Sequence, residues 1–196
     1  MEQGNFVSGH VYYSPDYADM LKRNNIKHVF LTRDLRDIVV SYTYFISGPY
    51  LYHPLREHML QLGSRKEQFL ALIQGVRTET VQYPDIGSWY QQFHGWSNHE
   101  DVCRLTFEQL MTSKATRRKA LERLLRFLSG NILARQSLRA VLNAMESRID
   151  PSNSLTFRKG VSGEWKHEFD DEVKQIVKQT AGKWLIADGY EKNNDW

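Results

Sequence analysis

Apolar residues are spaced along this chain in two ways, which separate the expected strands from the expected helices. Residues 26–31 and Val102–Thr106 are short runs rich in branched and aromatic side chains, and each predicts a buried strand. A helical spacing of three and four residues predicts at least one helix between them. It occurs at Phe69, Leu72, Ile73 and Val76.

Further helices are expected where this spacing recurs. One should begin at Asp34 and run to about Phe45, because Gly48 and Pro49 follow as a stop signal. Another is expected from about residue 115 to 128. The remaining apolar stripes are Trp89, Phe93 and Trp96; Leu138, Val141, Leu142 and Met145; and Val173, Ile176, Val177, Trp184 and Leu185.

Few strands among many helices indicate an α/β protein built in layers. A chain of 196 residues with 41% hydrophobic residues suits one domain, residues 1–196, with a sizeable core. No repeat, linker or low-complexity tract interrupts it. The small number of strands is low for such a fold.

Charge and composition exclude several classes of protein. The net charge of +3 is too mild to indicate nucleic-acid binding, and it suits a small anionic ligand equally well. No apolar run approaches the ~20 residues of a membrane span, and residues 1–10 do not resemble a signal peptide. Cys103 is the single cysteine, which fits a reducing, cytoplasmic location. The histidines offer no pair that combines metal-ligand spacing with neighbouring acids as ligands, so we expect no metal site.

Six cations crowd one stretch of the expected helix at residues 115–128. We interpret them as the solvated face of an amphipathic helix rather than a nucleic-acid patch. An alternative is a small helical interaction module that uses this face to bind anionic partners. The six are Lys114, Arg117, Arg118, Lys119, Arg123 and Arg126.

The first candidate for chemistry lies where the strand at 26–31 meets the helix that begins near Asp34. Such junctions bind phosphate, because unpaired N–H groups and the positive end of the helix dipole face the ligand. Arg33 offers a bidentate fork, and Ser41 lies two helical turns later with a hydroxyl. Local ion pairs among Arg33, Asp34, Arg36 and Asp37 explain the same charges equally well.

The second candidate is residues 157–166. Arg158 and Lys159 precede Gly160, and Gly163 follows; such glycines let the backbone approach an anion closely. Because the two cations repel each other, we expect the segment to be mobile until an anion binds. A surface loop anchored by Trp165 is the alternative.

Together the two segments closely resemble the two 3'-phosphate-binding segments of cytosolic-type and bacterial sulfotransferases. The family pattern Arg-Asp-Pro-x-Asp-x-x-x-Ser corresponds to Arg33–Ser41, with Leu35 in place of proline. The pattern Arg-Lys-Gly-x-x-Gly-x-Trp-Lys matches at every defined position from Arg158 to Lys166. The resemblance implies a three-layer fold like that of P-loop nucleotide kinases, with a parallel sheet flanked by helices.

The resemblance also implies the co-substrate and its contacts. The co-substrate would be 3'-phosphoadenosine-5'-phosphosulfate. Arg33 and Ser41 would hold its 3'-phosphate, and Arg158, Lys159 and Gly160 would close over the same nucleotide. Residues 105–110 resemble a strand-end segment of the family, so Phe107 either contacts the adenine side of the pocket or belongs to the core.

A histidine upstream of the first motif acts as general base in the family. His10 occupies the corresponding position, although Ser8 replaces the family's usual lysine two residues earlier. An imidazole with a pKa of about 6.5 accepts a hydroxyl proton readily at neutral pH. A structural histidine is the alternative for His10 taken alone.

The family's loop for the 5'-phosphosulfate, roughly Pro-Lys-Ser-Gly-Thr, has no counterpart in the residues before His10. We therefore expect a sheet that is incomplete at its N-terminal side and impaired activity of the chain as written. The free edge of such a sheet would provide a route to homo-oligomers.

The resemblance implies transfer of a sulfuryl group to a hydroxyl or amine of a small-molecule acceptor. Residues 48–53 are expected to face that acceptor. The alternative function is a non-catalytic truncated homologue that binds a nucleotide 3'-phosphate or a protein partner.

Overall fold

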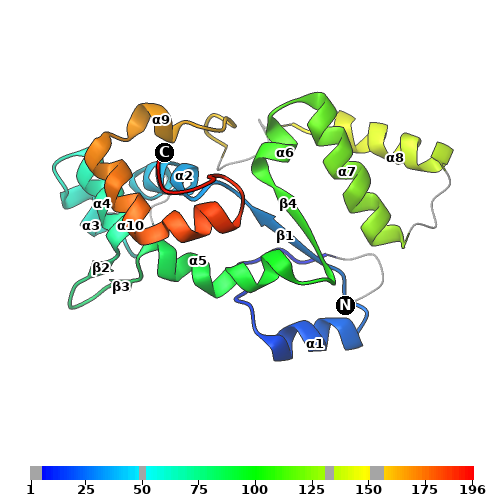
Figure 1. Cartoon of the computed structure of the whole chain (residues 1–196), viewed down its shortest axis with the longest axis horizontal. Helices are drawn as coiled ribbons and strands as arrows, with labels where there is room; N and C mark the ends of the chain where they lie inside the picture. Colours follow the sequence, from blue (N-terminus) through cyan, green and yellow to red (C-terminus); the bar gives the residue numbers. More distant parts are fainter. Residues whose placement is uncertain (1–5, 49–51, 131–134, 151–156) are drawn as a thin grey trace.

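The computed structural model describes residues 6–48, 52–130, 135–150 and 157–196. Helices dominate, and the strands are short (Figure 1). In chain order the elements are α1 (Pro15–Arg23), β1 (His28–Thr32), α2 (Leu35–Ser47), α3 (Arg56–Gln61), α4 (Arg65–Gln74), β2 (Val76–Arg77), β3 (Gln82–Tyr83), α5 (Ile86–His94), the 3-10 helix η1 (Gly95–Asn98), β4 (Val102–Thr106), α6 (Phe107–Met111), α7 (Lys114–Ser129), α8 (Arg135–Ser147), α9 (Trp165–Glu168) and α10 (Asp171–Ala187).

Helix starts are set by short polar side chains that accept a hydrogen bond from the first turn. Ser64 begins α4 with a reciprocal capping box through Glu67, and Ser113 begins α7 in the same way through Thr116. Asp34 caps α2, as the sequence predicts. Other capping residues of this kind are Ser14, Asp85, Thr106 and Asp170.

The central sheet of the described residues consists of β1 and β4, which run parallel in a register that pairs His28 with Val102 and Thr32 with Thr106. Side chains alternate between its two faces. Cys103 and Leu105 pack with Ala120 of α7, and Phe30 packs with the cores on the opposite side. Helices cover both faces, so the predicted α/β fold with a parallel sheet between helical layers is confirmed (Figure 1).

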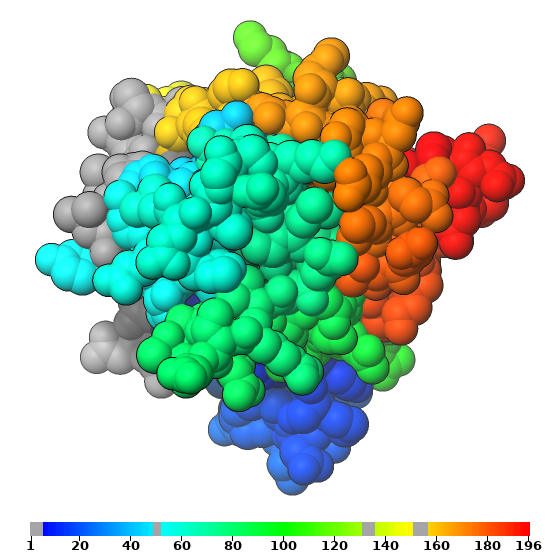
Figure 2. All heavy atoms as spheres, turned by 90° about the vertical axis from the view of Figure 1, so that its left-hand side faces the viewer, coloured from blue at the N-terminus to red at the C-terminus, as the bar shows by residue number. Residues whose placement is uncertain are grey.

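The largest core lies among α2, α4, α5, α9 and α10. Its fully buried side chains include Val40 and Ile46 of α2, Phe69 of α4 and Leu185 of α10. Burial of this many large apolar side chains is the main stabilising contribution to this half of the molecule. In Figure 2 the helices α3 and α4 form one continuous face with α10, and α1 stands at one end.

Two expectations from the apolar spacing are wrong in detail. Val76 does not continue the helix of Phe69, because Gly75 ends α4 with a φ of 84° and Val76 enters the short antiparallel pair β2–β3. Trp96 lies in η1 rather than in α5. Its ring is buried against α1, which the sequence reading did not predict.

The central sheet leaves apolar surface uncovered. Leu31 of β1 is 56% exposed, and β1 pairs only with β4 among the described strands. Association of two chains through this edge stays a prediction. Within the described ranges, no helix is long and apolar enough to cross a membrane, and no group of three or more metal-ligating side chains gathers.

Candidate functional site

The end of β1 and the start of α2 place Arg33 at the centre of a cluster of groups from distant parts of the chain. Its guanidinium lies over the ring of Phe107, 4.1 Å from the centroid, at the start of α6. Its Nη2 donates a hydrogen bond to the carbonyl oxygen of Val161 at 2.8 Å and lies 3.6 Å from Asp37. The Arg33 side chain is only 18% exposed, so these contacts hold it firmly at the junction.

Asp37 binds the backbone of the second segment. Its carboxylate accepts hydrogen bonds from the N–H of Gly163 at 2.6 Å and of Trp165 at 3.1 Å. Burial raises the pKa of this carboxyl, and the two backbone donors and Arg33 oppose that change. Arg33 and Asp37 together therefore hold residues 161–165 at three backbone atoms.

The glycines of the second segment are required by its backbone. Gly160 has a φ of 65° and Gly163 a φ of 81°, in the region that side chains disfavour. A Cβ on Gly160 would lie 2.7 Å from the ring of Phe157. The close approach of the chain at this point therefore depends on glycine.

Arg158 and Lys159 share a carboxylate that the sequence reading missed. Both oxygens of Glu164 accept hydrogen bonds from the Arg158 guanidinium, and Lys159 Nζ lies 2.7 Å from Oε1. These cations lower the pKa of Glu164 to about 2. The expectation that the two cations repel each other until an anion binds is therefore wrong, because Glu164 lies between them.

Ser41 lies on the side of α2 that faces this segment. It is four residues after Asp37 and three before Tyr44, and residues at these spacings share one helix face. Asp37 binds the segment, and the Tyr44 ring lies 4.4 Å below the Arg158 guanidinium. Ser41 is half-buried, and its hydroxyl has no hydrogen-bond partner among the described residues.

The Nε–H groups of Arg33 and Arg158 are also without a partner in the described ranges, although both are buried. A buried donor without a partner costs stability, so its presence requires an explanation. A phosphate oxygen is an acceptor of the kind that arginine donors bind. The residues present therefore fit a phosphate group.

The remaining charges of the junction pair locally, as the alternative interpretation of this cluster predicts. Arg36 Nε and Nη2 fork onto Asp34, at 2.9 Å and 2.7 Å, and Nη1 reaches Glu191 at 2.5 Å. Its guanidinium lies against the rings of Trp165 and Trp196. The arrangement is thus mixed: Arg36 and Asp34 are structural, and Arg33 faces the loop.

His10 lies apart from this cluster. Its segment packs along α5 and η1. The N–H of Tyr13 donates to the carbonyl oxygen of Gln92, and the Trp96 indole donates to the carbonyl oxygen of Val11. The imidazole is exposed and meets the ring of Phe93 edge-on at 6.4 Å. The structure shows no contact between His10 and Arg33, Ser41 or Arg158, and its catalytic role stays a prediction.

The segment expected to face the acceptor falls partly outside the described residues, since residues 49–51 are not among them. Beyond that gap, His53 Nε2 lies 2.6 Å from the hydroxyl of Tyr42. The His53 Nδ1 accepts from the N–H of Leu55, so the neutral ring donates to Tyr42 through Nε2. The sequence reading did not single out this pair.

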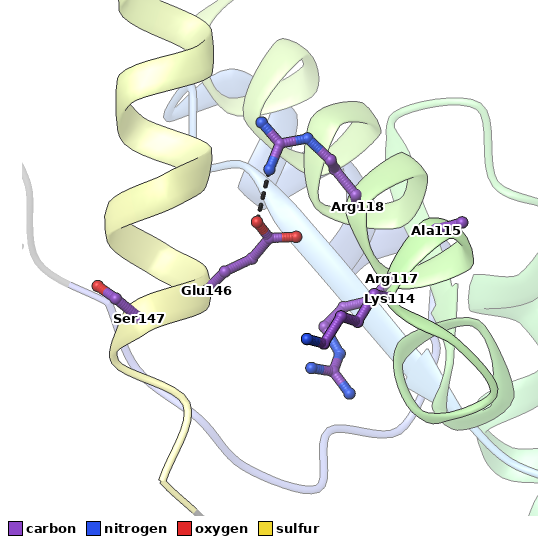
Figure 3. A pocket seen from close by; sticks show the side chains of 6 residues that line it. All are labelled: Lys114, Ala115, Arg117, Arg118, Glu146 and Ser147. Carbon is purple, nitrogen blue, oxygen red and sulfur yellow. Dashed lines mark hydrogen bonds and ion pairs between the residues drawn. The ribbon is translucent and has the colours of Figure 1, made fainter.

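The basic helix α7 is mostly not a free cationic face. A hollow of about 470 Å³ is lined by the start of α7 and the end of α8, where Arg118 meets Glu146 (Figure 3). Arg117 and Arg123 donate to the backbone carbonyls of Leu110 and Arg104. The interpretation of a simply solvated face is therefore wrong for these three arginines, which join α7 to α6, β4 and α8, whereas Arg126 is half exposed and pairs with Glu122 within α7.

Comparisons with known proteins show which family the chain resembles. The family model described as "Sulfotransferase domain" matches residues 3–189. Sulfotransferase 1 family member D1 of Rattus norvegicus is 24% identical over 183 residues, covering 81% of this chain and 57% of the relative. Sulfotransferase 2B1 of Mus musculus is 28% identical over 165 residues, covering 73% and 43%.

One solved structure shares the fold. The crystal structure of mouse sulfotransferase SULT7A1 complexed with PAP superposes with a TM-score of 0.53 at 18% identity, covering 83% of this chain and 61% of that one. The chain spans a little more than half the length of the first curated relatives it matches, 57% and 56%.

Proposed function

The chain belongs to the sulfotransferase domain family, and we propose that it binds 3'-phosphoadenosine-5'-phosphosulfate and transfers its sulfuryl group to a hydroxyl or amine. The observation that carries this proposal is the meeting of two motifs. Arg33 follows β1, Val161 lies in the Arg-Lys-Gly segment, and a 2.8 Å hydrogen bond joins them. The Nε–H groups of Arg33 and Arg158 are also unpaired within the described residues.

The nucleotide would lie between α2 and the loop at 158–163. Arg33, at the end of β1, and Ser41, on α2, would bind the 3'-phosphate from one side, and Arg158 and Lys159 would bind it from the loop. Gly160 lets the backbone approach closely, and the Phe107 ring offers a face to the adenine. Arginine forks suit phosphate oxygens because two parallel N–H bonds match their geometry.

The bound donor would supply an activated sulfuryl group, which passes to the acceptor as the bond from sulfur to the bridging oxygen breaks. In our proposal His10 accepts the proton that the attacking hydroxyl or amine loses. General-base assistance of this kind contributes about 10²- to 10⁴-fold. The exposed position of His10 leaves its face open to an acceptor.

A second candidate function is nucleotide binding without turnover. It would need only the groups proposed to hold the 3'-phosphate, and His10 contacts none of them. We also propose that the partner is a small molecule rather than nucleic acid and that the protein acts in the cytoplasm.

Calorimetric titration tests the binding half of the proposal. Adenosine 3',5'-bisphosphate should bind about 10- to 100-fold more tightly than adenosine 5'-monophosphate, because only the former carries the 3'-phosphate. Equal affinity for the two nucleotides would overturn the assignment of Arg33 and Arg158. Turnover of the sulfate donor by the same preparation then separates the enzyme from the non-catalytic binder.

A further inference from the structure

The C-terminal tail, residues 188–196, returns from α10 to the back of the proposed nucleotide site. In Figure 1 the C-terminus lies beside α9 and α2. Gly189 turns the chain with a φ of 78°, and the N–H groups of Tyr190 and Glu191 both bond the carbonyl of Leu185. The tail is therefore held in a defined path at the end of α10.

Tyr190 reaches the site through one carboxylate. Its buried hydroxyl donates to Glu108 Oε2 at 2.9 Å, and Glu108 Oε1 accepts from the N–H of Asp34 at 3.2 Å. Glu108 follows Phe107 directly, and Asp34 follows Arg33 directly. One hydrogen-bonded carboxylate thus links the tail to the neighbours of both groups that would face the nucleotide.

Glu191 reaches the same place through Arg36. The Arg36 side chain is 3% exposed, and its charge is balanced by Asp34 on one side and Glu191 on the other. The rings of Trp165 and Trp196, which meet each other edge-on, both lie against its guanidinium, with centroids 3.8 Å and 4.3 Å away. Removing one partner of such a buried ion pair is destabilising, because the other charge is left unpaired in the protein interior.

Asp188 reaches Thr32, the residue before Arg33, through Tyr90. Its carboxylate accepts a hydrogen bond from the hydroxyl of Tyr90, which also lies 3.2 Å from Thr32 Oγ1. Arg104 Nη2 lies 2.9 Å from the other oxygen of Asp188. The tail therefore acts on Thr32 and Asp34, the two residues that flank Arg33 in the chain.

We propose that the tail is a positioning element for Arg33 and Phe107. It contacts neither group, but through Tyr90, Glu108 and Arg36 it determines where the end of β1, the start of α6 and the first turn of α2 lie. Binding groups that are displaced by a fraction of an ångström lose affinity, because their hydrogen bonds to a ligand are short and directional. This inference rests on the proposed function, in which Arg33 and Phe107 hold the nucleotide.

The test compares Tyr190→Phe with the parent chain and with Tyr17→Phe. Tyr17 is partly exposed on α1, and its hydroxyl has no described hydrogen-bond partner, so it is the matched control. Tyr190→Phe should weaken binding of adenosine 3',5'-bisphosphate about 3- to 30-fold, the range for residues that act through neighbours. Glu191→Gln, which keeps the shape of the side chain, should have an effect of the same sign.

Hydrogen exchange without ligand separates this inference from the proposed function. Exchange of the Asp34 amide, which Glu108 holds, should be faster in Tyr190→Phe than in the parent or in Tyr17→Phe. If the parent binds the nucleotide and both tail variants bind it equally well, the inference fails. If the parent does not bind it, the proposed function fails, and an unchanged Asp34 exchange rate would overturn the positioning role as well.

Discussion

Arg33 donates a hydrogen bond of 2.8 Å to the carbonyl oxygen of Val161, although 128 residues separate the two in the chain. The contact joins the strand–helix junction to the Arg-Lys-Gly segment and closes one side of the proposed nucleotide site. Neither residue is a strong binding group alone, since a single arginine and a backbone carbonyl occur at many protein surfaces. Their meeting beside Phe107 makes the junction a candidate site.

Replacing Arg33 or Arg158 by alanine should weaken binding of adenosine 3',5'-bisphosphate by about 10- to 100-fold each, because a charge-assisted hydrogen bond contributes roughly 1.5–3 kcal/mol. Ser41→Ala should have a smaller effect of the same sign. Isothermal titration calorimetry measures the nucleotide affinity of each variant. Arg139→Ala is the matched control, since Arg139 is exposed on α8. If Arg33→Ala and Arg158→Ala both bind the nucleotide as tightly as the parent, the nucleotide site does not lie at this junction.

His10→Ala should lower the rate of sulfuryl transfer by about 10²- to 10⁴-fold, in a form of the protein that turns over the sulfate donor. Nucleotide affinity should stay unchanged, because His10 does not contact the phosphate-facing cluster. His58→Ala serves as the control histidine. Loss of nucleotide affinity with an unchanged rate would show that His10 binds ligand rather than acting as base.

The stability of the loop at 158–165 should depend on pH through Glu164. Its pKa falls from an ordinary value of 4.5 to about 2 in the folded protein, chiefly because Arg158 donates hydrogen bonds to it. A depressed carboxyl pKa contributes stability that is present above the unfolded value and is lost as pH falls through the folded value. Thermal melts of Glu164→Gln should therefore depend less on pH than parent melts between about pH 5 and pH 2. Parallel curves in that window would contradict the pairing.

Gly160→Ala should lower both stability and nucleotide affinity, because its φ of 65° is unfavourable for alanine and the added Cβ would meet the ring of Phe157. Gly130→Ala provides a matched control. Gly130 has a φ of 62° at the end of α7 and open space around it. Gly130→Ala should therefore lower the free energy of unfolding by about 1 kcal/mol through the backbone effect alone. Affinity should fall only in Gly160→Ala, and equal affinities would place the loop away from the ligand.

Asp37→Asn should loosen the loop without changing the size of the side chain. An asparagine has one carbonyl oxygen, so it cannot receive the N–H groups of Gly163 and Trp165 on two separate oxygens. We expect faster hydrogen exchange at both amides and a loss of about 1–3 kcal/mol in the free energy of unfolding. Asp171→Asn, at a fully exposed carboxylate of α10, should change neither measurement.

Local patterns in the sequence were sufficient for the elements that carry the site. The strand Val102–Thr106 matches its predicted bounds, and α2 begins after the predicted cap Asp34. These features depend on side-chain type within a few residues, through branching, capping and helical spacing. The resemblance of the two motifs to a family placed the phosphate-facing candidates.

Tertiary structure alone decided which charges meet. Arg158 and Arg36 look equivalent in sequence, but one faces Glu164 in the loop and the other lies against two tryptophan rings. The tail contact from Tyr190 to Glu108 spans 82 residues and has no local signature. An ion pair or buried hydrogen bond forms where folding brings two groups together and excludes water. Their partners therefore depend on the path of the whole chain, which local residue patterns do not determine.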